Sequence, residues 1–167
     1  DLFSEDGAVT GFSAMAGVYA EVVQIVADPA AGINSIADLK GKSVSVGDAG
    51  SGVEFNAKQI LEAYGLTFDD ISKQNLSFSA SADAYKDNKV DAFFCTAGAP
   101  TTAIMDLVTN REIKILSIDD DKSQKLIQDF PFYTVFDIPK GTYKGVDDDV
   151  KTLAVKATFI VSNELDE

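Results

Sequence analysis

The sequence predicts an α/β domain of the doubly wound kind, in which helices cover both faces of a mostly parallel sheet. Three observations support this prediction. Segments rich in β-branched and aromatic residues alternate with segments of helical periodicity along most of the 167 residues. Helices of this length between strands favour right-handed crossovers, which bring successive strands side by side and parallel. Hydrophobic residues make up 46 % and charged residues 25 %, which is typical of a globular protein rather than a disordered chain.

The first part of the chain predicts a long strand, a helical turn and a short strand. Residues 18–27 (VYAEVVQIVA) have the composition of a strand, and Pro29 follows it. Residues 35–40 (SIADLK) predict a capped helical turn that Gly41 closes. Residues 42–47 (KSVSVG) predict a short strand that leads into a glycine-rich turn.

Residues 51–64 carry the clearest helix pattern in the chain. Ser51 and Glu54 fit the S-x-x-E capping box of a helix start, and Gly65 fits a left-handed cap at its end. Apolar residues recur on one face of this helix at Val53, Ala57, Ile60, Leu61 and Tyr64. Both ends of the helix and its buried face are therefore specified locally.

The remaining segments continue the alternation and then depart from it. We expect strands at residues 76–78, 90–95 and 113–118, and helices at residues 82–86, 100–108 and 120–128. Two further strands are expected at residues 133–138 and 152–162, separated by a turn at residues 139–141 and an acidic stretch at residues 147–149. The acidic stretch lacks the loop spacing of a calcium site and is interpreted as solvated. Because no helix pattern follows the last strand, we expect a larger protein to continue beyond this chain.

The composition excludes several classes of function. The chain has 14 Lys and Arg against 27 Asp and Glu, a formal net charge of −13, and no His. Without His, Ser-His-Asp and Cys-His catalysis and imidazole metal sites are excluded. Arg111 is the only arginine, which argues against binding to nucleic acid or to an anionic membrane surface. The single Cys95 cannot form an internal disulfide, and we expect a buried thiol in an apolar strand.

A glycine-rich loop at residues 47–52 (GDAGSG) precedes the clearest helix. Its glycines permit positive φ and close approach of a ligand, and the first N–H groups of a helix are unpaired and carry positive partial charge. The loop therefore either holds an anion without a basic side chain or is a plain strand-to-helix turn capped by Ser51. Its spacing does not fit G-x-G-x-x-G or a phosphate loop, so nucleotide binding is not expected. Asp48 lies in the loop and Glu54 follows it, but no nucleophile or metal cluster accompanies these two carboxylates, and we expect no catalysis.

A second loop at residues 95–102 (CTAGAPTT) precedes another predicted helix. Pro100 fits the first helical position, and Gly98 permits close approach of a ligand. Hydroxyl groups are offered by Thr96, Thr101 and Thr102. The loop either receives an anion or polar ligand or is an ordinary helix start. In open α/β sheets ligands bind beyond the carboxyl ends of strands, which is where both loops are predicted to lie.

Several stretches resemble one class of solute receptors. Residues 32–42 (GINSIADLKGK), followed by VSVGDAGSGVEFNAKQILEAYGLTFDDIS, resemble the start of the second lobe in type II periplasmic solute-binding proteins. The stretches SGVEFNAKQILEAYGLTFDD, VDAFFCTAGAPTTAIMDL and DFPFYTVFDIPKGTYKGVDDDVKTLAVKATFIVS together resemble the TAXI family, the solute receptors of certain TRAP transporters, also called the immunogenic-protein family. The resemblance covers residues 18–162.

This resemblance implies one lobe of a two-lobe receptor. Residues 1–28 would hold an N-terminal segment and an outgoing hinge strand, residues 29–138 the second lobe, and residues 139–167 a returning hinge strand, with the other lobe absent. Such a type II lobe would work outside the cytoplasm, in the periplasm, with the membrane components of a TRAP transporter. Hinge strands that lack their lobe are also expected to be open to self-association.

The resemblance also implies a ligand and its contacts. Ligands of the family are acidic or amide amino acids, like glutamate and glutamine, and related carboxylates, captured without a cofactor in a cleft that closes by hinge bending. Carried onto this sequence, the contacts of the second lobe are Gly50, Ser51, Gly52, Glu54, Ala97, Gly98, Ala99 and Pro100. Sister TRAP receptors hold a carboxylate with an arginine, whereas Arg111 is expected at the opposite end of the lobe. Backbone N–H groups and hydroxyls would therefore bind an anion on this side.

Three other functions remain open on the sequence. The effector-binding domain of a transcriptional regulator uses the same fold, but such a regulator requires a DNA-binding helix-turn-helix and a basic surface. The sequence shows neither, which disfavours this alternative. An enzyme on this fold is disfavoured because His and a clustered nucleophile are absent. A stand-alone α/β domain without a ligand would not be stabilised by any small molecule.

Overall fold

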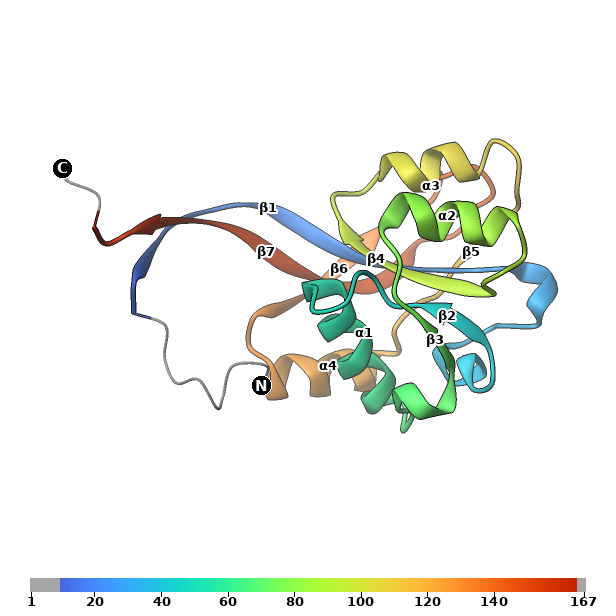
Figure 1. Ribbon diagram of the computed structural model, residues 1–167, viewed down its shortest axis with the longest axis horizontal. Coiled ribbons are helices and arrows are strands. Elements are labelled where there is room, and N and C mark those ends of the chain that lie inside the picture. The colour runs from blue at the N-terminus through green and yellow to red at the C-terminus, as the bar shows by residue number, and fades with distance from the viewer. Residues whose placement is uncertain (1–9, 165–167) are drawn as a thin grey trace.

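A computed structural model describes residues 10–164 as a sheet flanked by helices, with a two-stranded arm that extends from it (Figure 1). The strands are β1 (Phe12–Ala27), β2 (Ser43–Ser45), β3 (Ser72–Gln74), β4 (Ala92–Ala97), β5 (Lys114–Ile115), β6 (Tyr133–Ile138) and β7 (Val150–Ser162). The helices are α1 (Gly52–Ala63), α2 (Phe78–Lys86), α3 (Thr102–Leu107) and α4 (Asp120–Asp129). Short 3-10 turns lie at Pro29–Ala31, Ile36–Leu39 and Phe68–Asp70.

Helices pack on both faces of the sheet, which confirms the predicted fold class. One apolar cluster joins α1 and α4 to the face of β1 that carries Val23 and Ile25. A second cluster joins α2 and α3 to the opposite face, which carries Val22 and Val26. Successive side chains of β1 therefore enter different cores, as the two-residue period of a strand requires.

The sheet contains both parallel and antiparallel strand pairs. The predicted direction of the strands, mostly parallel, was therefore wrong. In the described part of the chain the strand order is β3-β2-β4-β1-β7-β6, with β5 paired to β1. Only β2 runs parallel to its partners, β3 and β4, whereas β1 pairs antiparallel with β4, β5 and β7, and β6 with β7. The connection from β6 to β7 contains no helix, and strands joined without a crossover pair antiparallel.

Local differences from the predicted elements have identifiable causes. The strand expected at residues 76–78 is instead the start of α2, because the Ser77 hydroxyl accepts a hydrogen bond from the N–H of Ala80 and caps that helix. The edge strand β3 lies just before it, at Ser72–Gln74. Pro100 is not the first residue of α3, since Thr101 is the N-cap and the helix begins at Thr102.

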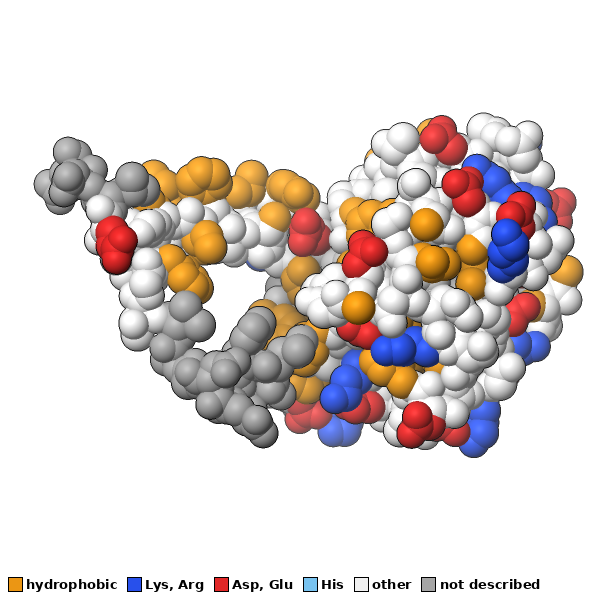
Figure 2. Space-filling model, in the orientation of Figure 1, with side chains coloured by type: hydrophobic (Ala, Val, Ile, Leu, Met, Phe, Trp, Pro, Cys, Tyr) orange, Lys and Arg blue, Asp and Glu red, His pale blue; other side chains and the backbone are white. Residues whose placement is uncertain are grey.

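The arm consists of the outer halves of β1 and β7. These halves pair antiparallel from Phe12↔Ser162 inward, with shifts of register between Ala14 and Ala16 and between Gly17 and Ala20. Apolar side chains are exposed along the arm (Figure 2) at Phe12, Met15, Val18, Tyr19, Phe159 and Ile160. No charged residue occurs at residues 11–20 or 157–162 of the sequence. The arm is thus an uncharged ribbon attached to a strongly acidic body.

No helix among residues 10–164 is long and apolar enough to cross a membrane.

Candidate ligand-binding site

Two loops lie at the same edge of the sheet. The strands β2 and β4 are parallel neighbours, paired through Val44↔Ala92 and Ser45↔Phe93, so their carboxyl ends point the same way. The first loop (residues 47–52) follows β2 and leads into α1. The second loop, expected at residues 95–102, is shorter in the structure: it runs from Ala97, the last residue of β4, to Thr101 and leads into α3. The structure therefore brings the two groups of candidate contacts to one end of the sheet, as predicted.

Glycine is required in the first loop by its backbone and its packing. Gly47 has a φ of +90°, and a Cβ there would lie 2.8 Å from the Cβ of Val53. Gly50 also has a positive φ, of +74°. The Asn75 side-chain amide donates to the Gly47 carbonyl at 2.9 Å and fixes the start of the loop. The loop can therefore run close to the helix start, which an ordinary side chain at position 47 would prevent.

Glu54 braces the first loop rather than closing a regular capping box. The Ser51 hydroxyl accepts from the N–H of Glu54 at 3.2 Å, as predicted, but the Glu54 carboxylate accepts from the N–H of Gly50 at 2.7 Å instead of that of Ser51. It also accepts from Lys73 at 2.8 Å and from Asn75 at 3.0 Å. The Lys73 ammonium and the Gly50 N–H lower the pKa of Glu54 to about 2. Glu54 is thus an ionised brace with its oxygens engaged by the chain itself.

A buried hydrogen-bond cluster holds the second loop. The Gln24 side-chain amide donates to the Thr101 hydroxyl at 2.8 Å and to the Ala97 carbonyl at 3.4 Å. The Thr101 hydroxyl donates to the Gly98 carbonyl at 2.7 Å. The Tyr143 hydroxyl accepts from the N–H of Thr101 at 2.7 Å and donates to the side-chain oxygen of Gln24. Side chains from β1 and from the β6–β7 connection therefore set the shape of this loop.

A second polar cluster links α1 to β4 beneath the two loops. The Thr96 hydroxyl donates to the side-chain oxygen of Asn56 at 3.1 Å, and the Asn56 amide donates to the Tyr133 hydroxyl at 2.7 Å. That hydroxyl donates in turn to Gln59 at 2.7 Å. Burial raises the pKa of Tyr133, so its hydroxyl stays protonated as a donor. The helix that follows the first loop is thereby fixed against the strand that precedes the second.

The candidate contacts differ in how far they are open to solvent. Exposed positions are Gly50, Gly52, Gly98 and Pro100, and half-buried ones are Ser51, Glu54, Ala97 and Ala99. The sequence did not reveal Gln24, Asn56 and Tyr143, which support these loops from below. Gln24 lies in an apolar strand, and its polar side chain was the available signal that it has partners in the core.

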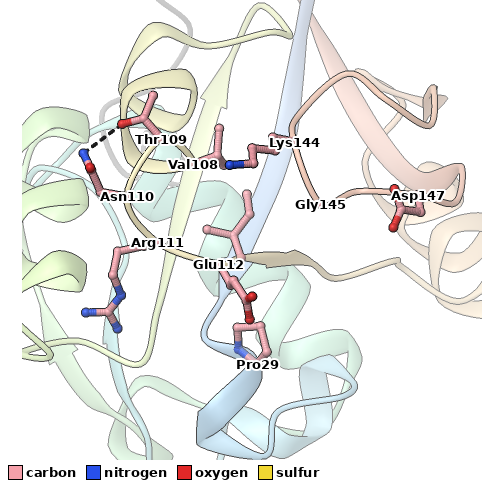
Figure 3. A pocket seen from close by; sticks show the side chains of 10 residues that line it. Pro29, Val108, Thr109, Asn110, Arg111, Glu112, Lys144, Gly145 and Asp147 are labelled. Atoms are coloured by element: carbon pink, nitrogen blue, oxygen red, sulfur yellow. Dashed lines mark hydrogen bonds between the residues drawn. The ribbon is translucent and has the colours of Figure 1, made fainter.

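Arg111 lies at the opposite end of the body, as expected. Its guanidinium donates to the Lys86 carbonyl at 2.7 Å and to Asn88 at 2.7 Å, and it pairs with Asp28 at 3.2 Å. Nearby, a surface depression of about 650 Å³ opens between the end of α3 and the β6–β7 connection (Figure 3). The Arg111 side chain points away from Asp147 there, and its bonds show that it joins segments of the body.

Cys95 lies in the interior of β4 with no exposed surface, as predicted. Burial raises the pKa of its thiol to about 12, so the thiolate that a nucleophile or metal ligand requires is not formed near neutral pH. Among residues 10–164, no three His, Cys, Asp or Glu side chains cluster in a way that could hold a metal ion.

Comparison with known proteins identifies similar sequences and folds. A model described as the NMT1-like family matches residues 1–167. The alkanesulfonate-binding protein SsuA from Xanthomonas axonopodis pv. citri, bound to MOPS, is 23 % identical with a TM-score of 0.52 over 70 % of this chain and 39 % of that one. The periplasmic aliphatic sulphonate binding protein SsuA from Escherichia coli is 23 % identical with a TM-score of 0.50, over 69 % and 36 % of the two chains.

A third structure is the putative sulfonate ABC transporter, periplasmic sulfonate-binding protein SsuA from Methylobacillus flagellatus KT. It is 21 % identical with a TM-score of 0.51, over 87 % of this chain and 36 % of that one. The chain thus spans less than two fifths of each of these three proteins. These similarities show the fold, which is that of a lobe of a periplasmic binding protein, as the sequence predicted.

Proposed function

The chain belongs to the NMT1-like family, and on that premise we propose that it is one lobe of an extracytoplasmic solute-binding receptor. The observation that carries the proposal is the placement of two ligand-accessible loops at one edge of the sheet, each braced by side chains from elsewhere in the chain. Ligands of α/β folds bind at such edges. The three similar structures are named as binding proteins for sulfonates, two of them as periplasmic, which supports an organic anion as the class of ligand.

In this proposal the ligand is a small carboxylate or amino acid, and its contacts are the candidate residues of the two loops, with Glu54 acting through the loop that it braces. The N–H of Gly50 already donates to Glu54, so an anion would meet other donors at the start of α1. The Ser51 hydroxyl caps the same helix start. The charge partner of the anion would lie on the opposing lobe, because Arg111 faces the other end of the body.

The proposed organisation follows the arm. The proposed lobe comprises residues 29–138, and the inner halves of β1 and β7 complete its sheet. The outer halves of these two strands, within residues 1–28 and 139–167, continue outward as the two hinge strands. An uncharged apolar ribbon is suited to burial in a second lobe, which would complete the cleft. The resemblance to TAXI receptors further favours membrane components of a TRAP transporter as partners, whereas one of the similar structures is named for an ABC transporter.

An NMR titration of the isotope-labelled chain tests this proposal, since it detects the weak binding expected of half a cleft. The probes are L-glutamate, L-glutamine, succinate, ethanesulfonate and MOPS. We expect at least one probe to shift amide signals in residues 47–54 and 97–101. Absence of any shift at about 100 mM probe, well beyond the millimolar range of weak ligands, or shifts confined to other segments, would contradict the proposal.

A matched pair of variants makes the titration specific. A Cβ at Gly98 or at Gly11 meets no atom within 4 Å, and neither residue has a positive φ, so both accept a larger side chain. Gly98→Val should obstruct the second loop and weaken binding of the probe at least about tenfold, or about 1.4 kcal/mol. Gly11→Val, at the outer end of the arm, should leave binding unchanged.

A further inference from the structure

The second loop is shaped by side chains that are remote in sequence and removed from solvent. Gln24 is 0 % exposed and Tyr143 is 1 % exposed. Thr101, which joins them, lies 77 residues from Gln24, and Tyr143 lies 119 residues from Gln24. Three backbone groups of the loop, the carbonyls of Ala97 and Gly98 and the N–H of Thr101, are bonded by this cluster.

The direction of each hydrogen bond in the cluster is determined. The Tyr143 hydroxyl accepts from the backbone N–H of Thr101, so its proton is directed to the side-chain oxygen of Gln24. The amide of Gln24 then donates to the Thr101 hydroxyl, whose own proton is directed to the Gly98 carbonyl. Burial raises the pKa of Tyr143, which keeps its donor in place at ordinary pH.

A purely structural strand would not need this cluster. The face of β1 that carries Gln24 also carries Val22 and Val26, and an aliphatic residue there would pack without the cost of burying an amide. The cluster instead fixes the peptide groups on either side of the segment 98–100. It also uses the N–H of Thr101, so that group is not a donor for a ligand.

We propose that Gln24 and Tyr143 are positioning residues that hold the second loop in its ligand-ready shape. This inference rests on the proposed function, because it takes residues 97–100 to face the solute. It assigns a binding role to β1 and to the β6–β7 connection, neither of which lies in the two loops. It also predicts that removing a single buried hydroxyl changes solute binding without removing any contact to the solute.

The test is Tyr143→Phe, with Tyr85→Phe as its control. Both tyrosines are 1 % exposed, and the hydroxyl of Tyr85 donates to the backbone carbonyls of Ala27 and Glu112, remote from the second loop. Amide hydrogen exchange of Thr101 and titration with L-glutamate and MOPS are measured on the parent and both variants. Tyr143→Phe should speed exchange of the Thr101 amide by roughly three- to tenfold, as loss of one hydrogen bond implies. It should also weaken binding of the bound probe by a similar factor.

Tyr85→Phe should leave the binding of the probe at its parent value. It should also leave the exchange rate of the Thr101 amide unchanged when that rate is compared with those of the α1 amides. Unchanged Thr101 exchange in Tyr143→Phe, or equal weakening of binding by the two variants, would overturn the inference. If neither probe binds the parent while Thr101 exchange still rises, the proposed function fails and the ligand role assigned to the cluster fails with it. If Tyr143→Phe does not fold, Thr101→Val takes its place, because it removes the hydroxyl that bonds Gln24 and Gly98 and should weaken binding of the bound probe. Thr101→Ser keeps that hydroxyl and should bind the probe as the parent does, so equal binding by Thr101→Val and Thr101→Ser would overturn the inference.

Discussion

At the scale of single residues, the first loop is held by Ser51, which caps α1, and by Glu54, whose carboxylate joins three segments of the chain. Ser51 was predicted as the cap of α1 because its oxygen needs to reach only three residues along the chain. Glu54 was predicted to close the capping box, yet its carboxylate bonds to Gly50, Lys73 and Asn75. The spacing of two residues in the sequence indicates which hydrogen-bond donors a side chain can reach locally. The folded structure determines which donors it actually bonds to, including those that are distant along the chain.

The brace formed by Glu54 predicts a pH-dependent stability. Its pKa in the folded chain is about 2 against an ordinary 4.5, so its stabilisation is fully present above pH 4.5 and is lost as pH falls towards 2. Glu54→Gln should lower the free energy of unfolding by about 1 kcal/mol at pH 7, since solvent partly screens Lys73. The difference from the parent should shrink below pH 4.5 in urea unfolding at a series of pH values.

Glu62→Gln, on the same helix, is the control for that measurement. Its partner Lys58 is 4.0 Å away and both side chains are half-exposed, so the change should stay within about 0.5 kcal/mol. Equal effects of the two substitutions, or a Glu54→Gln effect independent of pH, would show that the brace does not exist.

At the scale of elements, helices with local signals were predicted well and short strands poorly. The helix expected at residues 51–64 is α1 at Gly52–Ala63, because its cap, its apolar face and Gly65 all lie within it or next to it. The strand expected at residues 113–118 is reduced to β5 at Lys114–Ile115, which pairs with Val26 and Ala27 of β1. Beyond it the N–H of Leu116 still donates to Ile25, but that of Ile118 donates to Lys151 of β7, so the segment leaves β1. Strand length depends on the partner, which no local pattern encodes.

The contact between α1 and β4 predicts energetic coupling between two elements. Asn56→Leu should cost about 1–3 kcal/mol, because the Thr96 hydroxyl loses its acceptor and the Tyr133 hydroxyl loses a donor. Thr96→Val should cost about 1 kcal/mol by itself. The double variant should be more stable than the sum of the two losses by at least about 0.5 kcal/mol in urea unfolding.

Asn56→Leu combined with Ser77→Ala is the control pair for the double-mutant cycle of Asn56→Leu and Thr96→Val. Ser77 caps α2 on the other face of the sheet, so its effect should add to that of Asn56→Leu within about 0.5 kcal/mol. Additivity of Asn56→Leu with Thr96→Val would mean that α1 and β4 are not joined through this hydrogen bond.

At the scale of the whole molecule, the sequence predicted the layers but not the direction of every strand. Alternating strands and helices with two apolar faces were enough to predict helices on both sides of the sheet. The antiparallel placement of β1 beside both β4 and β7 depends on pairings that are distant along the chain, such as Val22↔Ala97 and Val22↔Ala154. Patterns within one segment carry no information on such pairings.

The exposed arm predicts that the chain self-associates when nothing covers it. Met15 and Phe159 are 70 % and 59 % exposed, and a two-stranded ribbon alone is only marginally stable in water. Sedimentation measured over a range of concentrations should show reversible association at about 10–100 μM, the regime of weak apolar contacts. Met15→Lys with Phe159→Lys should weaken this association at least about tenfold through charge repulsion.

Val135→Lys is the control for the arm variants. Val135 is 49 % exposed but lies on β6 in the body, so this substitution adds charge without touching the arm. Association that is equally sensitive to Val135→Lys would assign it to the body, and a chain that is monomeric at every concentration would contradict the prediction.

The arm also has a topological consequence. The N–H of Asn163 donates to the carbonyl of Gly11 at 3.0 Å, so the described chain enters and leaves through one pair of hydrogen-bonded neighbours. Both cores and both loops lie on the chain between these two hydrogen-bonded residues. The body therefore meets the geometric requirement of a domain insertion, because its two ends leave it at the spacing of neighbouring strands.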